Sequence, residues 1–248
     1  MTSSTGLRGL VVDWGGVLTA SLDSAMAQWA ATDGVDFEHF RSVMRSWVGS
    51  RRPGDDPDAG GSGAPAPVLT EGAVADLEQA ADVGPAGTSP VHRLERGELD
   101  AGEFEEALAR ELAQRGSPVE AEGLLRRLLG GLEQLDPQML GLVRRAHDAG
   151  IRTALLSNSW GDHYPEELWD GLFDAVVISG RVGMRKPDAG IFAHTAELLG
   201  LPPSACVMVD DLPHNISGAV AAGMVGVRHT DYATTLAELE VLFELDLH

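Results

Sequence analysis

Short apolar runs alternate with helix-like segments through the second half of the chain, and this alternation restricts the possible folds more than any other feature. Strands are expected at 10–12, 151–156, 175–178, 205–209 and 225–227. Helices are expected between and after them, at 137–149, 165–169, 188–199, 213–222 and 234–243. Strands that alternate with helices in this way are typical of a parallel sheet with helices on both faces. The sequence therefore predicts an α/β fold with a doubly wound parallel sheet.

A long segment separates the first predicted strand from the second. It contains helical patterns at 21–31, 36–48, 98–115 and 119–132, and no convincing strand. The composition from 50 to 67 is rich in Gly, Pro, Asp and Ala, which is typical of a flexible loop, and 83–90 is a shorter loop of the same kind. We therefore expect an α/β core made of 1–19 plus 137–248, and an inserted α-helical module at 20–136 with a flexible insert at about 50–67.

The chain is strongly acidic, with a formal net charge of −20 over 248 residues. Such a charge repels nucleic-acid phosphates and anionic lipid headgroups, so we expect no nucleic-acid partner and no membrane role. No apolar run approaches the roughly 20 residues of a transmembrane helix, and the first residues lack a signal-peptide pattern. A cytoplasmic location is the resulting expectation, for either a monomer or a homodimer.

Polar residues follow four of the predicted strands at the same end of each strand. They are Asp13 after the first strand, Ser157 and Asn158 after the second, Lys186 in the loop after the third, and Asp210 and Asp211 after the fourth. Ligands of open parallel sheets bind beyond the carboxyl ends of the strands. We therefore expect these side chains to meet at one edge of the sheet.

The residue types at this edge favour phosphoryl chemistry. Converging carboxylates repel one another unless a cation joins them, and Mg²⁺ commonly binds one or two carboxylates together with a substrate phosphate. A lysine and a hydroxyl can hold the other phosphoryl oxygens, while a carboxylate beside the phosphorus can attack it to form an aspartyl-phosphate. Each residue alone is more often a turn, a cap or a surface residue. Their joint occurrence at the same end of separate strands favours the functional interpretation.

The segments that carry these residues match four sequence motifs of a known family. The segments are 13–19 (DWGGVLT), 156–159 (LSNS), 183–188 (GMRKPD) followed by Ile191 and Phe192, and 209–211 (VDD) with Asn215 and Gly218. In these motifs the chain resembles the haloacid dehalogenase superfamily. The resemblance covers about 1–19 and 137–248 well. It covers the inserted module loosely, through 95–98 (ERGE) and the helix that follows.

The resemblance implies a fold and a metal site. It implies a Rossmann-like core with a helical cap that selects the substrate, and cap movement about joints near 19–21 and 135–137. It also implies that Asp13 is the nucleophile. Mg²⁺ would be bound by Asp13, by the backbone carbonyl of Gly15, and by Asp210 or Asp211.

The resemblance also implies an activity. Ser157 and Lys186 would bind the transferred phosphoryl group, and Asn158 would support them. The expected protein is a magnesium-dependent phosphatase that hydrolyses a small phosphorylated metabolite through an aspartyl-phosphate intermediate.

Gly15 departs from the phosphatase pattern of the family, in which a second aspartate at this position serves as general acid and base. Positioned acid–base catalysis contributes about 10²- to 10⁴-fold in rate. Three outcomes are open. The substrate has a good leaving group, such as an anomeric sugar phosphate or an acyl phosphate; or another residue, such as His163 or His214, takes the role; or turnover has been lost.

Two other functions are compatible with the sequence. A catalytically silent binding or regulatory protein would explain Gly15 and the low-complexity insert. A metal-independent 2-haloacid dehalogenase would also lack the second aspartate. Those relatives, however, have uncharged residues in place of the paired acids of the fourth motif. Asp210 and Asp211 therefore argue for a metal and for a phosphatase.

Overall fold

The structure is a computed structural model that describes residues 6–48, 89–161, 164–165, 169 and 171–248. Four expectations lie wholly or mostly outside these residues: the flexible insert at about 50–67, the shorter loop at 83–90, the predicted helix at 165–169, and His163. Within the described ranges, no helix combines the length and the apolar character needed to cross a bilayer.

One parallel sheet forms the centre of the molecule, with the strand order β3-β2-β1-β4-β5. The strands are β1 (Gly9–Val12), β2 (Arg152–Ser157), β3 (Ala175–Ile178), β4 (Cys206–Asp210) and β5 (Val225–Arg228). All residues of β1 and β4 are buried, as expected for parallel strands that are covered on both faces. The predicted α/β fold with a Rossmann-like parallel sheet is confirmed.

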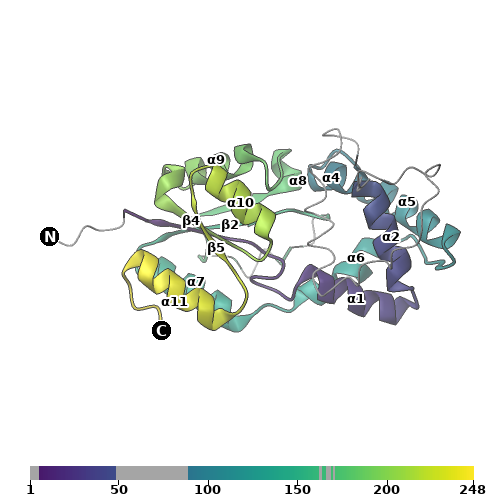
Figure 1. Cartoon of the computed structure of the whole chain (residues 1–248), viewed down its shortest axis with the longest axis horizontal. Coiled ribbons are helices and arrows are strands. Elements are labelled where there is room, and N and C mark those ends of the chain that lie inside the picture. The colour runs from purple at the N-terminus through teal and green to yellow at the C-terminus, as the bar shows by residue number, and fades with distance from the viewer. Residues whose placement is uncertain (1–5, 49–88, 162–163, 166–168, 170) are drawn as a thin grey trace, which may run out of the picture.

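Helices cover both faces of this sheet (Figure 1). The helices α7 (Pro137–Asp148) and α11 (Tyr232–Phe243) lie on one face. The helices α9 (Ala189–Leu198) and α10 (Pro213–Ala221) lie on the other, and the short α8 (Ser179–Val182) follows β3 directly.

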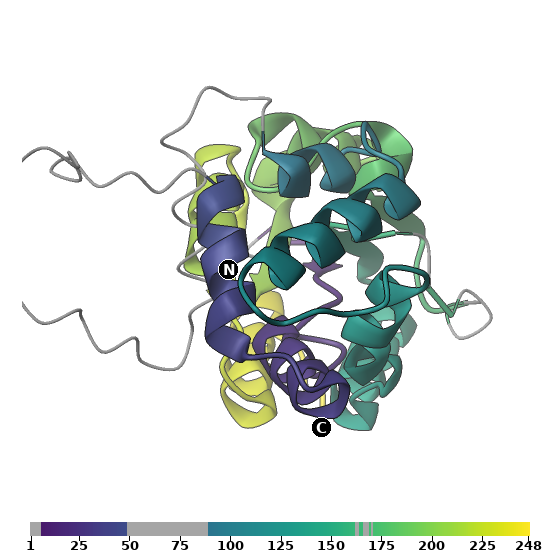
Figure 2. The ribbon, with the colours of Figure 1, turned by 90° about the vertical axis from the view of Figure 1, so that its right-hand side faces the viewer.

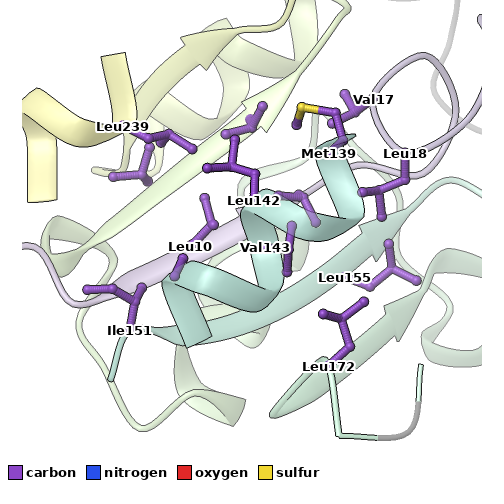
Figure 3. Packing of buried hydrophobic residues seen from close by; sticks show 14 of the residues in the cluster. Leu10, Val17, Leu18, Met139, Leu142, Val143, Ile151, Leu155, Leu172 and Leu239 are labelled. Atoms are coloured by element: carbon purple, nitrogen blue, oxygen red, sulfur yellow. The ribbon is translucent and has the colours of Figure 1, made fainter. Parts of the chain in front are cut away.

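The core follows from the two-residue period of the central strand. Leu10 faces a cluster that includes Leu142 and Val143 of α7 (Figure 3). Val11, one residue later, belongs to the cluster on the opposite face, which includes Phe192 of α9. Because successive side chains of a strand point to opposite faces, β1 joins the two layers of the core.

The described residues between β1 and α7 form a second group of helices. The group consists of α1 (Leu22–Asp33), α2 (Phe37–Val48), α4 (Pro90–Glu95), α5 (Ala101–Gln114) and α6 (Leu124–Leu129). These helices bury a hydrophobic cluster of their own, around Phe40, Phe104 and Leu128. The group lies beyond the carboxyl edge of the sheet (Figure 1), and Figure 2 views the molecule from its side.

Two helices of this group differ from the expectation. The helix α4 was not predicted, because its six residues follow a loop-like composition; Pro90 occupies its first turn, where a missing N–H costs nothing. The helix predicted at 119–132 is limited to α6, and the chain continues as a 3₁₀ helix at Gly130–Glu133. The poor helix propensity of Gly130 and Gly131 accounts for the change.

The segments that connect the helical group to the sheet pair with each other. Thr19 and Leu135 form an isolated antiparallel bridge. The backbone N–H of Asp136 donates to the carbonyl of Leu18 at 2.8 Å. The paired segments coincide with the predicted joints, and movement at these joints stays a prediction.

Candidate active site

A buried lysine joins two of the predicted carboxylates. Lys186 Nζ lies 2.7 Å from Asp13 Oδ1 and 2.6 Å from Asp210 Oδ2, and all three residues are buried. Asp13 follows β1, Asp210 ends β4, and Lys186 lies between α8 and α9. Neighbouring strands of a parallel sheet thus bring together residues that are far apart in the sequence, as expected at the carboxyl edge.

Asp13 is held in place by backbone contacts. Its N–H donates to the carbonyl of Val209 at 3.0 Å, and the N–H of Trp14 donates to its Oδ1 at 2.7 Å. Burial raises the pKa of Asp13 to about 7, although the nearby Lys186 ammonium opposes the shift. A bound cation would therefore favour the charged form of this carboxylate.

Asp210 is almost saturated with hydrogen bonds. It accepts from Leu212 N at 2.9 Å and from Asn215 Nδ2, which lies 3.1 Å from each carboxylate oxygen. With Lys186 these contacts use most of the roughly four acceptor positions of a carboxylate. Burial alone would lower the pKa of Lys186, but Asp13 and Asp210 outweigh it and raise that pKa above its ordinary value. Asp210 therefore keeps Lys186 charged and in place.

Asp211 has acceptor capacity left. Its Oδ1 atom is buried and has no hydrogen-bond partner among the described residues. Burial, with repulsion from Asp13 and Asp210, raises the pKa of Asp211 to about 8. A buried carboxylate oxygen without a donor is the kind of atom that a cation can satisfy.

Gly16 makes room for Asp211, although the sequence analysis gave it no role. Its φ is +76°, and a Cβ at this position would lie 2.1 Å from Asp211 Oδ2. Glycine is therefore required both by the backbone conformation and by the approach of the carboxylate. The paired glycines 15 and 16 are the signal in the sequence that could have indicated this.

The three acids fit a hard divalent cation. One carboxylate oxygen from each of Asp13, Asp210 and Asp211 lies within 4.8 Å of the other two. Oxygen ligands of this kind suit Mg²⁺, which commonly takes one or two carboxylates. Because Asp210 is largely committed to its hydrogen bonds, Asp13 and Asp211 are the better candidates for ligands.

The motif at the end of β2 acts on the lysine through the backbone. Asn158 Nδ2 donates to the carbonyl of Lys186 at 3.0 Å, and the N–H of Lys186 donates to Asn158 Oδ1 at 2.8 Å. Ser157 Oγ lies 2.9 Å from Tyr164 Oη, and either oxygen can be the donor. Asn158 thus fixes the lysine, and Ser157 presents a hydroxyl that is held by a phenol.

Tyr164 is a residue of this edge that sequence reasoning missed. Its ring lies 5.6 Å from the ring of Trp14 and 5.5 Å from that of Trp169, centroid to centroid. Such spacings are those of stabilising aromatic pairs. The only signal in the sequence was an aromatic residue a few positions after the second motif. Aromatic residues in such positions are too common for this signal to be interpreted.

Two further expectations concern residues near the site. Gly15 faces open space, because a Cβ built on it would meet no atom within 4 Å. His214 is buried in the first turn of α10, and burial lowers its pKa, so it is mainly neutral at pH 7. Trp160, which follows the second motif, packs against Phe104 of the helical group.

The fold and the site define a class of protein, a Rossmann-like α/β enzyme with acids and a lysine at the carboxyl edge of its sheet. The sequence model of one family, described as haloacid dehalogenase-like hydrolase, matches residues 7–223. The chain belongs to this family of hydrolases. The resemblance found in the four motifs is thereby confirmed.

Individual relatives include phosphatases. A sesquiterpene phosphatase of Aspergillus oryzae is 30% identical over 155 residues, which are 60% of this chain and 77% of that protein. The phosphoserine phosphatase of Thermus thermophilus is 33% identical over 136 residues, 51% of this chain and 55% of that protein. The match thus spans only about half of the second relative.

A solved structure shares the fold. A HAD family enzyme of Bacteroides thetaiotaomicron, in complex with magnesium and inorganic phosphate, has a TM-score of 0.52 and 17% sequence identity. The match covers 90% of this chain and 93% of that enzyme. At this level of identity the likeness concerns the fold.

Proposed function

We propose that the chain is a magnesium-dependent phosphatase that hydrolyses a small phosphorylated metabolite, with Asp13 as its nucleophile. The observation that carries the proposal is the contact of Lys186 Nζ with Asp13 Oδ1, at 2.7 Å, beside two further acids. The phosphatases among the relatives support the choice of a phosphate ester over other substrates of the family.

In the proposed reaction a carboxylate oxygen of Asp13 forms a bond to phosphorus, and the bond from phosphorus to the leaving oxygen breaks. Water then hydrolyses the resulting acyl phosphate and restores the carboxylate. Lys186 and the Ser157 hydroxyl bind phosphoryl oxygens, and Asn158 keeps the lysine in position. Asp13, Asp211 and the Gly15 carbonyl would hold Mg²⁺, with Asp210 beside them. The ion would supply positive charge that neutralises the phosphate.

Gly15 bears on the choice of substrate. No side chain extends from this position to protonate the leaving oxygen, and His214 is mainly neutral. We therefore expect the best substrates to have leaving groups that depart without protonation, such as acyl or anomeric sugar phosphates. The helical module at 20–136 is proposed as the cap that selects among them, over a core of 1–19 plus 137–248.

Phosphate release tests the proposal. The wild type and Asp13→Asn are assayed on acyl phosphates, sugar phosphates and aryl phosphates, with Mg²⁺ and with chelator. We expect release by the wild type that needs Mg²⁺ and is lost in the variant. If both proteins are inert on the whole panel, the chain is a silent binding protein. Halide release from 2-haloacids that persists in chelator would favour the dehalogenase instead.

A further inference from the structure

Glu95, at the end of α4, is a fully buried acid that the proposed reaction does not use. Its Oε2 accepts from Arg185 Nε at 2.6 Å, and its Oε1 lies 3.3 Å from Trp160 Nε1. Glu95 is 0% exposed, and the side chain of Arg185 is 4% exposed. This ion pair connects the helical module to the segment between β3 and α9.

The backbone at the end of α4, from Glu95 to Gly97, also fits closely against the core. Ser179 Oγ donates to the carbonyl of Glu95, and the N–H of Ser159 donates to Ser179 Oγ at 2.8 Å. A Cβ on Gly97 would lie 2.5 Å from the carbonyl oxygen of Gly180, so only glycine allows this approach. Figure 1 shows the result: α4 lies beside α8.

The core residues that Glu95 contacts are neighbours of the site residues in the sequence. Arg185 directly precedes Lys186, and Trp160 follows the segment that contains Asn158. Asn158 and Lys186 are joined by two hydrogen bonds. Glu95 therefore touches both segments that set the position of the lysine.

Stability alone is a weak reason for such an arrangement. The cost of taking two charges out of water commonly equals or exceeds their attraction, so apolar residues would serve as well. The ion pair does fix geometry, and Lys186 must reach Asp13 and Asp210 at once.

We propose that Glu95 is a positioning residue of the active site, which holds the Arg185–Lys186 segment through its ion pair and thereby places the Lys186 ammonium. The proposal rests on the function proposed above for Lys186. It assigns to the helical module a direct part in shaping the catalytic edge.

The first test compares Glu95→Gln with Glu98→Gln. Glu98 lies three residues further along and pairs with Arg96 at 2.7 Å, but its side chain is 48% exposed, which makes it a matched control. A displacement of a catalytic group by about 1 Å can cost about 10²-fold in rate. We expect Glu95→Gln to lower kcat about 10²-fold with a smaller change in KM, and Glu98→Gln to have no effect. Equal activities of both variants would overturn the proposal.

A second variant separates positioning from stability. In Glu95→Gln alone the buried Arg185 charge loses its ion pair with Glu95, so the Tm should fall; in Glu95→Gln with Arg185→Met both charges are gone, and the Tm should recover. If Glu95 positions Lys186, kcat stays low in the double variant although the Tm recovers. If kcat recovers together with the Tm, the role is only structural and the proposal fails.

Hydrogen exchange gives a readout that does not depend on turnover. The amides of 183–186 should exchange faster in Glu95→Gln than in the wild type, and those of 236–243 in α11 should be unchanged. Unchanged exchange at 183–186 would overturn the positioning role. A wild type that releases no phosphate, with faster exchange in the variant, would instead refute the proposed function and leave the positioning of the loop supported.

Discussion

Two adjacent glycines have opposite surroundings at the scale of single residues. Gly15 faces open space, whereas Gly16 is pressed against the carboxylate of Asp211. The pair therefore sets two properties of the site. Gly15 provides no side chain that could act as the general acid and base of the family's phosphatases. The lack of a side chain at Gly16 lets Asp211 approach Asp13.

Gly15→Asp should raise activity selectively. The new side chain has room, and φ of Gly15 is not positive, so the carboxyl can extend toward the leaving group without backbone strain. Protonation helps poor leaving groups most, so kcat/KM for alkyl phosphates should rise by up to about 10²-fold and by much less for aryl phosphates. The measurement is the ratio of the two values, with Gly15→Asn as the control, because an amide of similar size cannot act as a general acid or base. Equal gains on both substrates would contradict the acid–base explanation.

Gly16→Ala should weaken Mg²⁺ binding. The methyl group would clash with Asp211 Oδ2 and push that carboxylate away from Asp13. Positive φ at a non-glycine residue adds a stability cost of about 1–3 kcal/mol. Gly200→Ala is the matched control, because Gly200 has φ +68° and open space around its Cβ. Calorimetry should detect weaker Mg²⁺ binding in Gly16→Ala alone, while both variants lose stability. Equal Mg²⁺ affinities would show that Asp211 does not depend on Gly16.

At the scale of elements, a side-chain cap determines where helix α7 begins. Asp136 precedes α7, and its Oδ1 accepts from Gln138 N at 2.7 Å and from Met139 N at 3.1 Å. These bonds satisfy two N–H groups that the first turn of a helix leaves without a partner. The cap also fixes where α7 starts, directly after the segment that pairs with Leu18.

Asp136→Ala should lower the free energy of unfolding by about 1 kcal/mol, the usual cost of losing a helix cap. The catalytic edge should keep its activity, since Asp136 contacts none of the residues proposed to react. Asp148→Ala, at the exposed far end of the same helix, is the control and should cause no loss. Urea unfolding measures the difference. A variant as stable as the wild type would show that α7 does not need its cap.

Local pattern was sufficient to predict the elements of the core. Each strand of the sheet is a short apolar run followed by a polar residue, so β3 was predicted residue for residue and the other strands to within one residue at each end. The helix that local pattern did not predict at all, α4, depends on partners far away in the sequence. The short helix α4 is stabilised by contacts such as Glu95 with Arg185, which lie 90 residues apart and leave no local periodicity.

The sequence predicted which residues meet at the candidate site better than it predicted how their side chains are bonded there. The expected acids and Lys186 do meet, because the topology of a parallel sheet brings strand ends together. The sequence could not show that Asp210 is occupied by hydrogen bonds while Asp211 keeps a free acceptor oxygen among the described residues. This difference arises because Leu212 N and Asn215 Nδ2 donate to the carboxylate of Asp210 and not to that of Asp211. Hydrogen-bond saturation of this kind is a property of coordinates and not of spacing.

The whole molecule combines a net charge of −20 with a buried cluster of acids. Both features oppose the ionisation of Asp13 and Asp211, and Lys186 offsets only part of this opposition. In the metal-free protein, repulsion between these acids therefore lowers the free energy of unfolding, and increasingly so as the acids lose their protons. A divalent cation would remove that repulsion, which links metal binding to the stability of the fold.

The stability of the metal-free protein should fall as pH rises from about 4 to about 8. The pKa values of Asp13 and Asp211 are raised from 3.8 to about 7 and about 8. The unfolded chain releases these protons near pH 4, whereas the native site keeps them, so the native state binds more protons and loses stability as pH rises. Mg²⁺ needs the ionised acids, so its stabilising effect should grow between pH 6 and pH 8. At 100 times its Kd the ion adds about 2.7 kcal/mol. Thermal unfolding with Mg²⁺ and with chelator across this range gives both quantities.

The acidic surface also lowers stability as pH rises, so the contribution of the site must be isolated. Asp211→Asn keeps nearly the whole surface charge but removes the acid with the higher pKa. Its metal-free stability should depend less on pH between 4 and 8, and Mg²⁺ should raise its Tm far less than that of the wild type. If the variant and the wild type respond alike to pH and to Mg²⁺, the slope belongs to the surface and the acids do not form the metal site. A difference that appears only with Mg²⁺ would place the ion at Asp211 and assign the pH dependence to other groups.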